Sequence, residues 1–220
     1  ISINPMFNIK NAKILLTGGH GFVGSRVYEE LVKAGAKPAN ILRPRKKELD
    51  LRLLANIKKA VRGKDLVIHL AATVGGIGLN REKPGTLFYD SAIMGIQLIE
   101  EARKAKVKKF LQIGTVCAYP KFPPHIPFRE EDLWSGYPEE TNAPYGLAKK
   151  MLMVMLQAYR QEYGFNGIYL LPTNLYGPGD NFDPKSSHVI PALIKKFVEA
   201  KQQNLPEVVE KISDGLRQII

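Results

Sequence analysis

Short, almost wholly apolar runs alternate with longer segments of helical spacing along this chain of 220 residues. The apolar runs, which we expect to form strands, cover residues 12–17, 40–43, 65–72, 109–115 and 167–173. The helical segments cover residues 24–34, 51–61, 86–105, 143–163 and 188–201. Strands without polar alternation are buried on both faces, and strands joined by helices run parallel. The sequence therefore predicts an α/β protein with a doubly wound parallel sheet, a Rossmann fold.

Composition narrows the class of protein further. A hydrophobic content of 45% with 24% charged residues indicates a packed globular protein, and no apolar run is long enough to cross a bilayer. Cys117 is the single cysteine, which favours the reducing cytoplasm. The net charge of +11 suits an anionic substrate or cofactor as well as a nucleic acid. The basic residues form scattered pairs without interleaved aromatics, so we expect neither a nucleic-acid nor a membrane partner.

A glycine-rich turn, TGGHGFVG at residues 17–24, joins the first predicted strand to the first helix. Such a turn lets a pyrophosphate approach the backbone closely, while the N–H groups of the helix N-terminus face it. Glycine turns also serve packing alone, but this one follows the first strand of an alternating chain, which favours a dinucleotide site. The expected cofactor contacts here are Gly18, Gly21, Phe22, Val23 and Gly24.

The end of the second predicted strand bears on which dinucleotide binds. Arg43 is followed by Pro44 and three further basic residues, and no acid occurs before Glu48. An acid at this point would bind the free 2′-hydroxyl of NAD, whereas basic residues suit a 2′-phosphate. The sequence therefore favours NADP(H), with Arg43 as a contact. The alternative is a solvated basic loop.

Tyr145 and Lys149 lie four positions apart on the predicted helix 143–163, so they share one helix face. A lysine ammonium near a phenol favours the phenolate and lowers the pKa of the tyrosine. The same spacing occurs often by chance on helix surfaces. The pair alone does not distinguish a catalytic site from an ordinary helix face.

The pair follows a dinucleotide turn and a strand that ends Gly114-Thr115. This combination resembles the extended short-chain dehydrogenase/reductases, in which Ser or Thr, Tyr and Lys form the catalytic set. The resemblance implies that Thr115 holds the substrate oxygen and that Tyr145 exchanges a proton. It also implies that Lys149 grips the nicotinamide ribose.

Longer sequence segments make the resemblance specific to one family. They read ATVGGI at 72–77, GTVCAYP at 114–120, TNAPY at 141–145, PTNLYGP at 172–178 and DNFDPKSSHVIPA at 180–192. In unbroken order, from about residue 13 to residue 200, the chain is similar to the GDP-L-fucose synthases. That family epimerises the two carbons beside the ketone of GDP-4-keto-6-deoxymannose and then reduces the ketone with NADPH. The alternatives are another nucleotide-sugar epimerase or dehydratase of the superfamily, or a dinucleotide-binding module without catalysis.

The resemblance assigns roles to further residues. Epimerisation beside a ketone needs one group that removes a proton and another that returns one, and the matching blocks imply Cys117 and His188. Without the resemblance, a lone cysteine is usually a small apolar residue, and a histidine at a helix start is often a cap. The remaining implied cofactor contacts are Ala71, Ala72, Tyr145, Lys149, Pro172, Asn174, Leu175 and His188. The implied substrate contacts are Val74, Gly75, Asn174 and Lys196, the last of which could equally lie on a solvated helix face; we expect no metal.

Three positions depart from the family pattern without removing a chemical function. His20 stands where the synthases carry an arginine, Thr115 where serine is commoner, and Ser91 where extended members often have asparagine. By the same resemblance, two copies would pair through the helices predicted at 86–105 and 143–163. The apolar run MLMVML at 151–156 is compatible with that pairing and with burial inside one copy.

The last part of the chain bears on domain organisation. The resemblance implies an NADP-binding Rossmann domain at residues 1–180 and a remnant of a substrate-binding domain at 181–220. Family members continue beyond residue 201 with further strands and helices, so we expect a truncated substrate domain in this sequence. Residues 206–220 are expected to form one short amphipathic helix.

Overall fold

The parallel sheet expected from the apolar runs is present in the computed structural model, which describes residues 7–183, 187–207 and 210. Its strands are β1 (Ile14–Thr17), β2 (Ile41–Leu42), β3 (Leu66–His69), β4 (Lys109–Ile113) and β5 (Gly167–Leu170). All neighbours pair in parallel, in the order β2-β1-β3-β4-β5. The chain moves outward from β1 to β2, then returns to place β3 on the other side. This reversal confirms the doubly wound topology.

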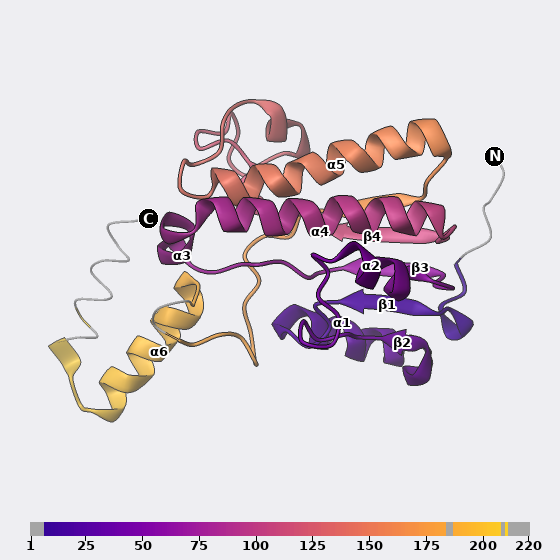
Figure 1. The fold of residues 1–220 in the computed structure, drawn as a ribbon. Coiled ribbons are helices and arrows are strands. Elements are labelled where there is room, and N and C mark those ends of the chain that lie inside the picture. Colours follow the sequence, from indigo (N-terminus) through magenta and orange to yellow (C-terminus); the bar gives the residue numbers. More distant parts are fainter. Residues whose placement is uncertain (1–6, 184–186, 208–209, 211–220) are drawn as a thin grey trace.

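Six α-helices connect and follow the strands in the described part of the chain (Figure 1). They are α1 (Phe22–Lys33), α2 (Leu54–Val61), α3 (Ile77–Glu82), α4 (Pro84–Lys104), α5 (Ala143–Tyr163) and α6 (Val189–Gln202). Helix α5 has the predicted bounds, whereas α2 begins three residues later than predicted and α3 was not predicted. The short 3₁₀ segments are η1 (Ile9–Asn11), η2 (Pro38–Asn40), η3 (Val116–Ala118) and η4 (Glu130–Trp134).

Both faces of the sheet are covered by helices. Because side chains alternate along a strand, Leu15, Val67 and Phe110 point to one face, where they pack with α2, α4 and α5. Ile14 and Ile68 point to the other face, where α1 lies. Figure 1 shows α4 and α5 side by side in the upper part of the view, with β4 next to α4, and α1 beside β1 and β2 in the lower part. The prediction of strands buried on both faces is thus confirmed.

Three strands end sooner than their apolar runs. β3, β4 and β5 stop at His69, Ile113 and Leu170, two or three residues before the predicted ends. The residues that follow leave the hydrogen-bonded ladder at the carboxyl edge of the sheet. Apolar composition continued past the last paired residue, which is why the sequence overestimated these strands.

The proline-rich segment 119–138, between β4 and α5, is held in place by side-chain bonds. Its helical turn η4 is anchored by Asp132, whose carboxylate lies 2.8 Å from His125 Nδ1 and accepts a bond from the Arg129 backbone N–H. Lys150 of α5 donates its ammonium to the Leu133 carbonyl oxygen and lies 4.2 Å from the ring of Trp134. The loop is therefore fixed onto the first half of α5.

Helix α6 lies to one side of the sheet in Figure 1 and carries several exposed apolar side chains, among them Val189 and Val198. The helix predicted at 206–220 falls mostly outside the described residues. Among the residues that are described, no helix is both long and apolar enough to cross a membrane. The proposed domain boundary near residue 180 stays a prediction.

Candidate active site

A pocket of about 1070 Å³ opens at the carboxyl edge of the sheet, around the position where the strand order reverses between β1 and β3. Ligands of open parallel sheets bind at such positions. Most of the residues singled out from the sequence line this one pocket. They are Gly18, Gly21, Phe22, Val23, Gly24, Ala71, Ala72, Val74, Gly75, Thr115, Cys117, Tyr145, Pro172, Asn174, Leu175 and His188.

Three of the four glycines of the first turn, Gly18, Gly21 and Gly24, serve different purposes. Gly18 has a φ of +70°, and a Cβ there would lie 2.8 Å from the Ala71 backbone nitrogen. A Cβ at Gly24 would overlap the Gly18 carbonyl oxygen, so both glycines are needed by the fold itself. At Gly21 a Cβ would meet only that same oxygen, at 3.4 Å, and φ is an ordinary −79°. Gly21 therefore leaves space that the protein does not fill.

Helix α1 begins beside that space. Its N-cap is Gly21, which provides no side-chain hydrogen bond, and the first helical residues Phe22 and Val23 line the pocket. The first N–H groups of a helix have no partner within the helix and carry partial positive charge. The space at Gly21 and these N–H groups fit the pyrophosphate of a dinucleotide.

The basic loop after β2 places its charges differently from the sequence prediction. Arg43 is absent from the pocket wall: its guanidinium lies 3.4 Å above the ring of Tyr28, and His20 Nε2 lies 2.9 Å from its carbonyl oxygen. Arg45 and Lys46 line the pocket instead. The positive charge expected at the end of β2 is present, but it comes from the residues after Arg43, whose side chain stacks on α1.

Tyr145 lines the pocket, whereas Lys149 lies buried beneath it with 2% of its surface exposed. Lys149 Nζ donates to the Ile113 carbonyl oxygen at 3.2 Å and lies 6.0 Å from the centre of the Tyr145 ring. Burial lowers the pKa of Lys149 to about 8.

The expected effect of Lys149 on Tyr145 is not found. Burial, and to a smaller degree the nearby Cys117, raises the pKa of Tyr145 well above its usual range. The reason is geometric, since the ammonium is turned toward the Ile113 carbonyl instead of the phenol. Tyr145 is thus protonated at neutral pH, the form that can donate a proton.

The turn η3 brings Thr115 and Cys117 to the same wall as Tyr145. Thr115 caps η3, and its Oγ1 accepts a hydrogen bond from the Cys117 backbone N–H at 3.2 Å. Helix α5 can pack directly on this turn because residue 146 is glycine, where a Cβ would overlap the Cys117 carbonyl oxygen. This close approach places Cys117 and Tyr145 together.

His188, Asn174 and Leu175 line the pocket from the segment between β5 and α6, with His188 as the N-cap of α6. Lys196, two turns further along α6, does not line it. The substrate contact expected from Lys196 is therefore not seen in the described pocket, whereas Val74 and Gly75 line it, and their contact with a substrate stays a prediction.

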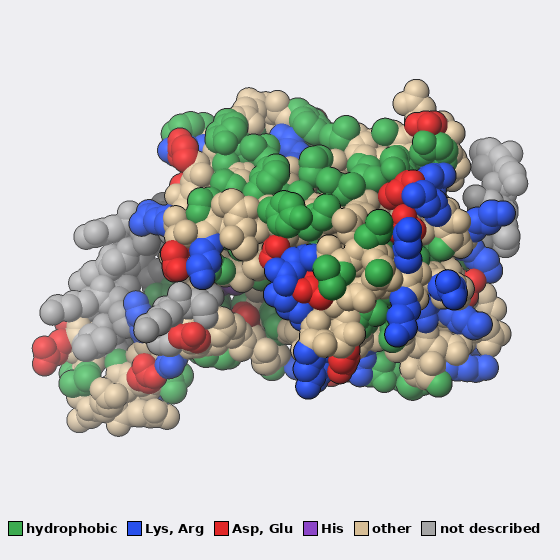
Figure 2. Space-filling view, in the orientation of Figure 1, with side chains coloured by type: hydrophobic (Ala, Val, Ile, Leu, Met, Phe, Trp, Pro, Cys, Tyr) green, Lys and Arg blue, Asp and Glu red, His purple; other side chains and the backbone are tan. Residues whose placement is uncertain are grey.

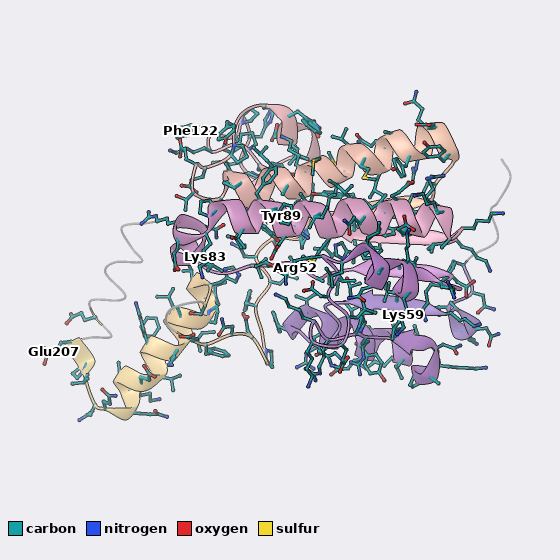
Figure 3. All side chains as sticks on the ribbon, viewed as in Figure 1. Arg52, Lys59, Lys83, Tyr89, Phe122 and Glu207 are labelled. Atoms are coloured by element: carbon teal, nitrogen blue, oxygen red, sulfur yellow. The ribbon has the colours of Figure 1, made fainter. Side chains whose placement is uncertain are left out.

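A charged cluster that the sequence did not reveal forms part of the wall. The Arg52 side chain donates three hydrogen bonds of 2.6 to 3.2 Å to the Asp50 carboxylate and its backbone N–H donates a fourth, which together lower the pKa of that carboxyl to about 2. Arg52 Nη1 also lies 3.6 Å from Asp90 Oδ2, which accepts a bond of 3.0 Å from the Thr73 hydroxyl. Figure 3 shows Arg52 near the middle of the molecule, below α4. Asp50 and Arg52 precede α2, Thr73 follows β3 and Asp90 lies on α4, so no local spacing signalled the cluster as a whole.

Asn80 of α3 is a second missed residue. Its side-chain amide donates to the carbonyl oxygens of Gly75 and Gly76, at 3.1 and 3.2 Å, and so fixes the loop that carries Val74. Within the described part of the chain, no group of three or more His, Cys, Asp or Glu side chains could hold a metal ion.

The amino-acid sequence matches the profile of a known protein family. The profile of the NAD dependent epimerase/dehydratase family matches residues 14–218, nearly the whole chain. The chain belongs to the NAD dependent epimerase/dehydratase family. Within this family, it is similar to the probable GDP-L-fucose synthase 1 of Oryza sativa subsp. japonica, with 40% identity over 91% of the chain and 61% of the relative. The GDP-L-fucose synthase of Escherichia coli K12 is 38% identical over 90% of the chain and 61% of the relative.

Solved structures of the family agree with the fold. A GDP-L-fucose synthetase from Naegleria fowleri bound to NADP aligns with a TM-score of 0.80 and 30% identity, over 92% of this chain and 62% of that one. A GDP-6-OMe-4-keto-L-xylo-heptose reductase from C. jejuni aligns with a TM-score of 0.82 and 28% identity, over 94% and 60%. The sequence thus spans about three fifths of the length of these relatives.

Proposed function

We propose that this family member catalyses the NADPH-dependent conversion of GDP-4-keto-6-deoxymannose into GDP-L-fucose. The observation that carries the proposal is the meeting of Thr115, Cys117 and Tyr145 on one wall of a pocket that also contains the uncapped glycine turn. Similarity to several GDP-L-fucose synthases over about nine tenths of the chain supports the same reaction.

The cofactor half of the pocket suits NADPH. The space at Gly21 accommodates the pyrophosphate, and Arg45 with Lys46 supplies the positive charge that a 2′-phosphate requires. The bound NADPH supplies the hydride for the ketone. We assign Lys149 to the hydroxyl groups of the nicotinamide ribose, which it would reach by turning its ammonium from the Ile113 carbonyl oxygen toward the pocket.

The reduction step follows from the state of two hydroxyl groups. Tyr145 is protonated and buried at the pocket wall, so it can donate its proton to the ketone oxygen as that oxygen becomes an alcohol. The Thr115 oxygen already accepts from the Cys117 N–H, which leaves its hydroxyl hydrogen free to bond the same ketone oxygen. Both donors stabilise negative charge that develops there.

The epimerisation step requires proton transfer at the carbons beside the ketone. Cys117 on η3 and His188 at the start of α6 line the pocket from different elements. We assign one of them to remove the proton and the other to return one to the opposite face of the sugar. The hydroxyls of Thr115 and Tyr145 would hold the enolate oxygen formed between the two transfers.

The test separates the two steps. NADPH oxidation in the presence of GDP-4-keto-6-deoxymannose reports reduction, and entry of solvent deuterium into the sugar without NADPH reports epimerisation. Cys117→Ser should abolish deuterium entry, and unchanged exchange would remove Cys117 from the proton-transfer pair. Binding of NADPH without turnover or exchange would favour the non-catalytic module. Turnover of a different sugar nucleotide would favour another epimerase.

We further propose that two copies pair through α4 and α5, in the cytoplasm. Phe88 and Tyr89 of α4 and Met151 and Val154 of α5 are between 36% and 61% exposed. Figure 2 shows hydrophobic side chains gathered over these two helices. A second copy presenting the same face would cover them. The single Cys117 is consistent with a reducing compartment.

A further inference from the structure

Four polar side chains form a row across the sheet near the carboxyl ends of the strands. The parallel register pairs Thr17 with His69, His69 with Gln112, and Gln112 with Tyr169. Directly paired residues of neighbouring strands point to the same face, so all four lie on one side of the sheet. That side is the one covered by α4 and α5, because Tyr169 packs against the same core cluster as Phe110. We call these four residues the polar row.

The row is buried and partly bonded to itself. Thr17, His69 and Gln112 are at most 1% exposed. Thr17 Oγ1 lies 2.7 Å from His69 Nδ1 and accepts a second bond, of 3.3 Å, from the Ala71 N–H. Burial, and then the charge of Lys149, lowers the pKa of His69 to about 3. His69 is therefore neutral at physiological pH.

Two members of the row, Gln112 and Tyr169, form hydrogen bonds with backbone oxygens next to the Lys149 side chain and on Lys149 itself. Gln112 Nε2 donates to the Ile113 carbonyl oxygen at 2.8 Å, and Lys149 Nζ donates to the same oxygen at 3.2 Å. The Tyr169 hydroxyl donates to the backbone oxygen of Lys149 at 3.0 Å. The Tyr169 ring fits there because residue 114 is glycine, where a Cβ would lie 2.5 Å from the ring. The row thus contacts both the helix turn that carries Lys149 and the carbonyl that holds its ammonium.

Stability alone does not account for the row. Gln112 Oε1 is buried without a hydrogen-bond partner among the described residues, and an unpaired buried acceptor is costly. Apolar side chains, like Val67 and Phe110 two residues earlier on the same face of the same strands, would pack there without that cost. Polar groups in this place, despite that cost, indicate a functional role, and the functional side chain that they adjoin is Lys149.

We propose that the polar row is the positioning element of Lys149: it fixes the turn and the carbonyl that hold the lysine, and it presents only uncharged groups beneath the ammonium. The inference rests on the proposed function, because Lys149 matters to catalysis only as the partner of Tyr145. The titratable groups around Lys149 are His69 on β3, Tyr169 on β5 and Tyr145 on its own helix, with Cys117 next to Tyr145.

The first test measures Lys149 directly and needs neither cofactor nor substrate. The side-chain signals of the lysines are followed by NMR as the pH is raised, in the 220-residue chain, with Lys149→Met used to assign the signal. Two donors on one oxygen lie close together, so Gln112→Glu should raise the titration midpoint of Lys149 by about one pH unit or more. The uncharged Gln112→Leu should not raise it. A midpoint that Gln112→Glu leaves unchanged would overturn the proposal.

The second test uses a pair of matched tyrosine variants. Tyr169→Phe removes the bond to the Lys149 backbone, and Tyr159→Phe removes a 2.9 Å bond to Glu100 at the other end of α5. The NADPH dissociation constant should rise about three- to tenfold for Tyr169→Phe and stay unchanged for Tyr159→Phe. If both variants changed the NADPH dissociation constant equally, the row would stabilise the fold without positioning Lys149, and the proposal would be wrong. If the unmodified chain fails to bind NADPH, the proposed function is wrong, and the NMR titration still decides the role of the row.

Discussion

Tyr145 lies on the pocket wall as a protonated phenol, because burial raises its pKa and Lys149 is turned away from it. We predict that Tyr145→Phe lowers the rate of NADPH oxidation about 100-fold or more, which is the usual contribution of a positioned acid. The dissociation constant of NADPH, measured by fluorescence titration, should change little because the ring remains. A variant that still reduces the ketone at the original rate would exclude Tyr145 as the donor.

Lys149 makes the stability of the fold depend on pH. Its pKa falls from 10.5 to about 8 in the folded chain, so the unfolded chain binds more protons between these values. The free energy of unfolding therefore contains a penalty that is fully present below about pH 8 and is relieved as the pH rises toward about 10.5, amounting to about 3 kcal/mol at most.

We predict that Lys149→Met is more stable than the unmodified chain at neutral pH, by about 1 to 3 kcal/mol. This advantage should shrink as the pH rises from about 8 to about 10, because the buried lysine then becomes neutral. Urea unfolding of both proteins across this range measures the difference, in which the titration of all other groups cancels. An advantage that stays constant with pH would show that the lysine does not titrate in this window.

At the scale of elements, the close contact of α4 with α5 depends on a glycine. A Cβ at Gly95 would overlap the side chain of Leu152, which is fully buried, whereas a Cβ at Gly85 on the same helix would meet nothing within 4 Å. We predict that Gly95→Ala destabilises the chain by about 1–3 kcal/mol through overpacking. Gly85→Ala should stabilise it by about 0.5–1 kcal/mol, because alanine favours the helix. Chemical unfolding of the two variants gives both signs, and two similar values would contradict the packing argument.

At the scale of the whole molecule, the apolar surface over α4 and α5 predicts the oligomeric state. Val154 on α5 and Val198 on α6 are 46% and 49% exposed, so they form a matched pair for substitution by lysine. Val154→Lys should convert a dimer into a monomer, since burying an unpaired ammonium in the interface is costly. Val198→Lys should leave the dimer intact. Light scattering coupled to gel filtration measures the molar mass of each variant. If the unmodified chain is already a monomer, the proposed pairing is wrong.

Periodicity was sufficient to place most of the regular elements. Helix α5 has the predicted bounds because its apolar spacing is continuous and glycine ends it at residue 164, where φ is +63°. Helix α3 escaped prediction because it is only six residues long and contains a glycine. The segment around Asp132 escaped because its order comes from side-chain bonds instead of a repeating pattern.

The sequence by itself determined the order of the elements, the parallel sheet, the glycine turn and the placement of Tyr145 and Lys149 on one helix face. All of these follow from spacing within a short segment. Only the tertiary structure decided that Arg45 and Lys46, instead of Arg43, line the pocket, and that Lys149 bonds to Ile113. The polar row, too, was decided only by the tertiary structure, because its members are separated by 40 residues or more in sequence and meet only through the register of the strands. Strand register and helix packing are set by burial over the whole sheet, which no local pattern records.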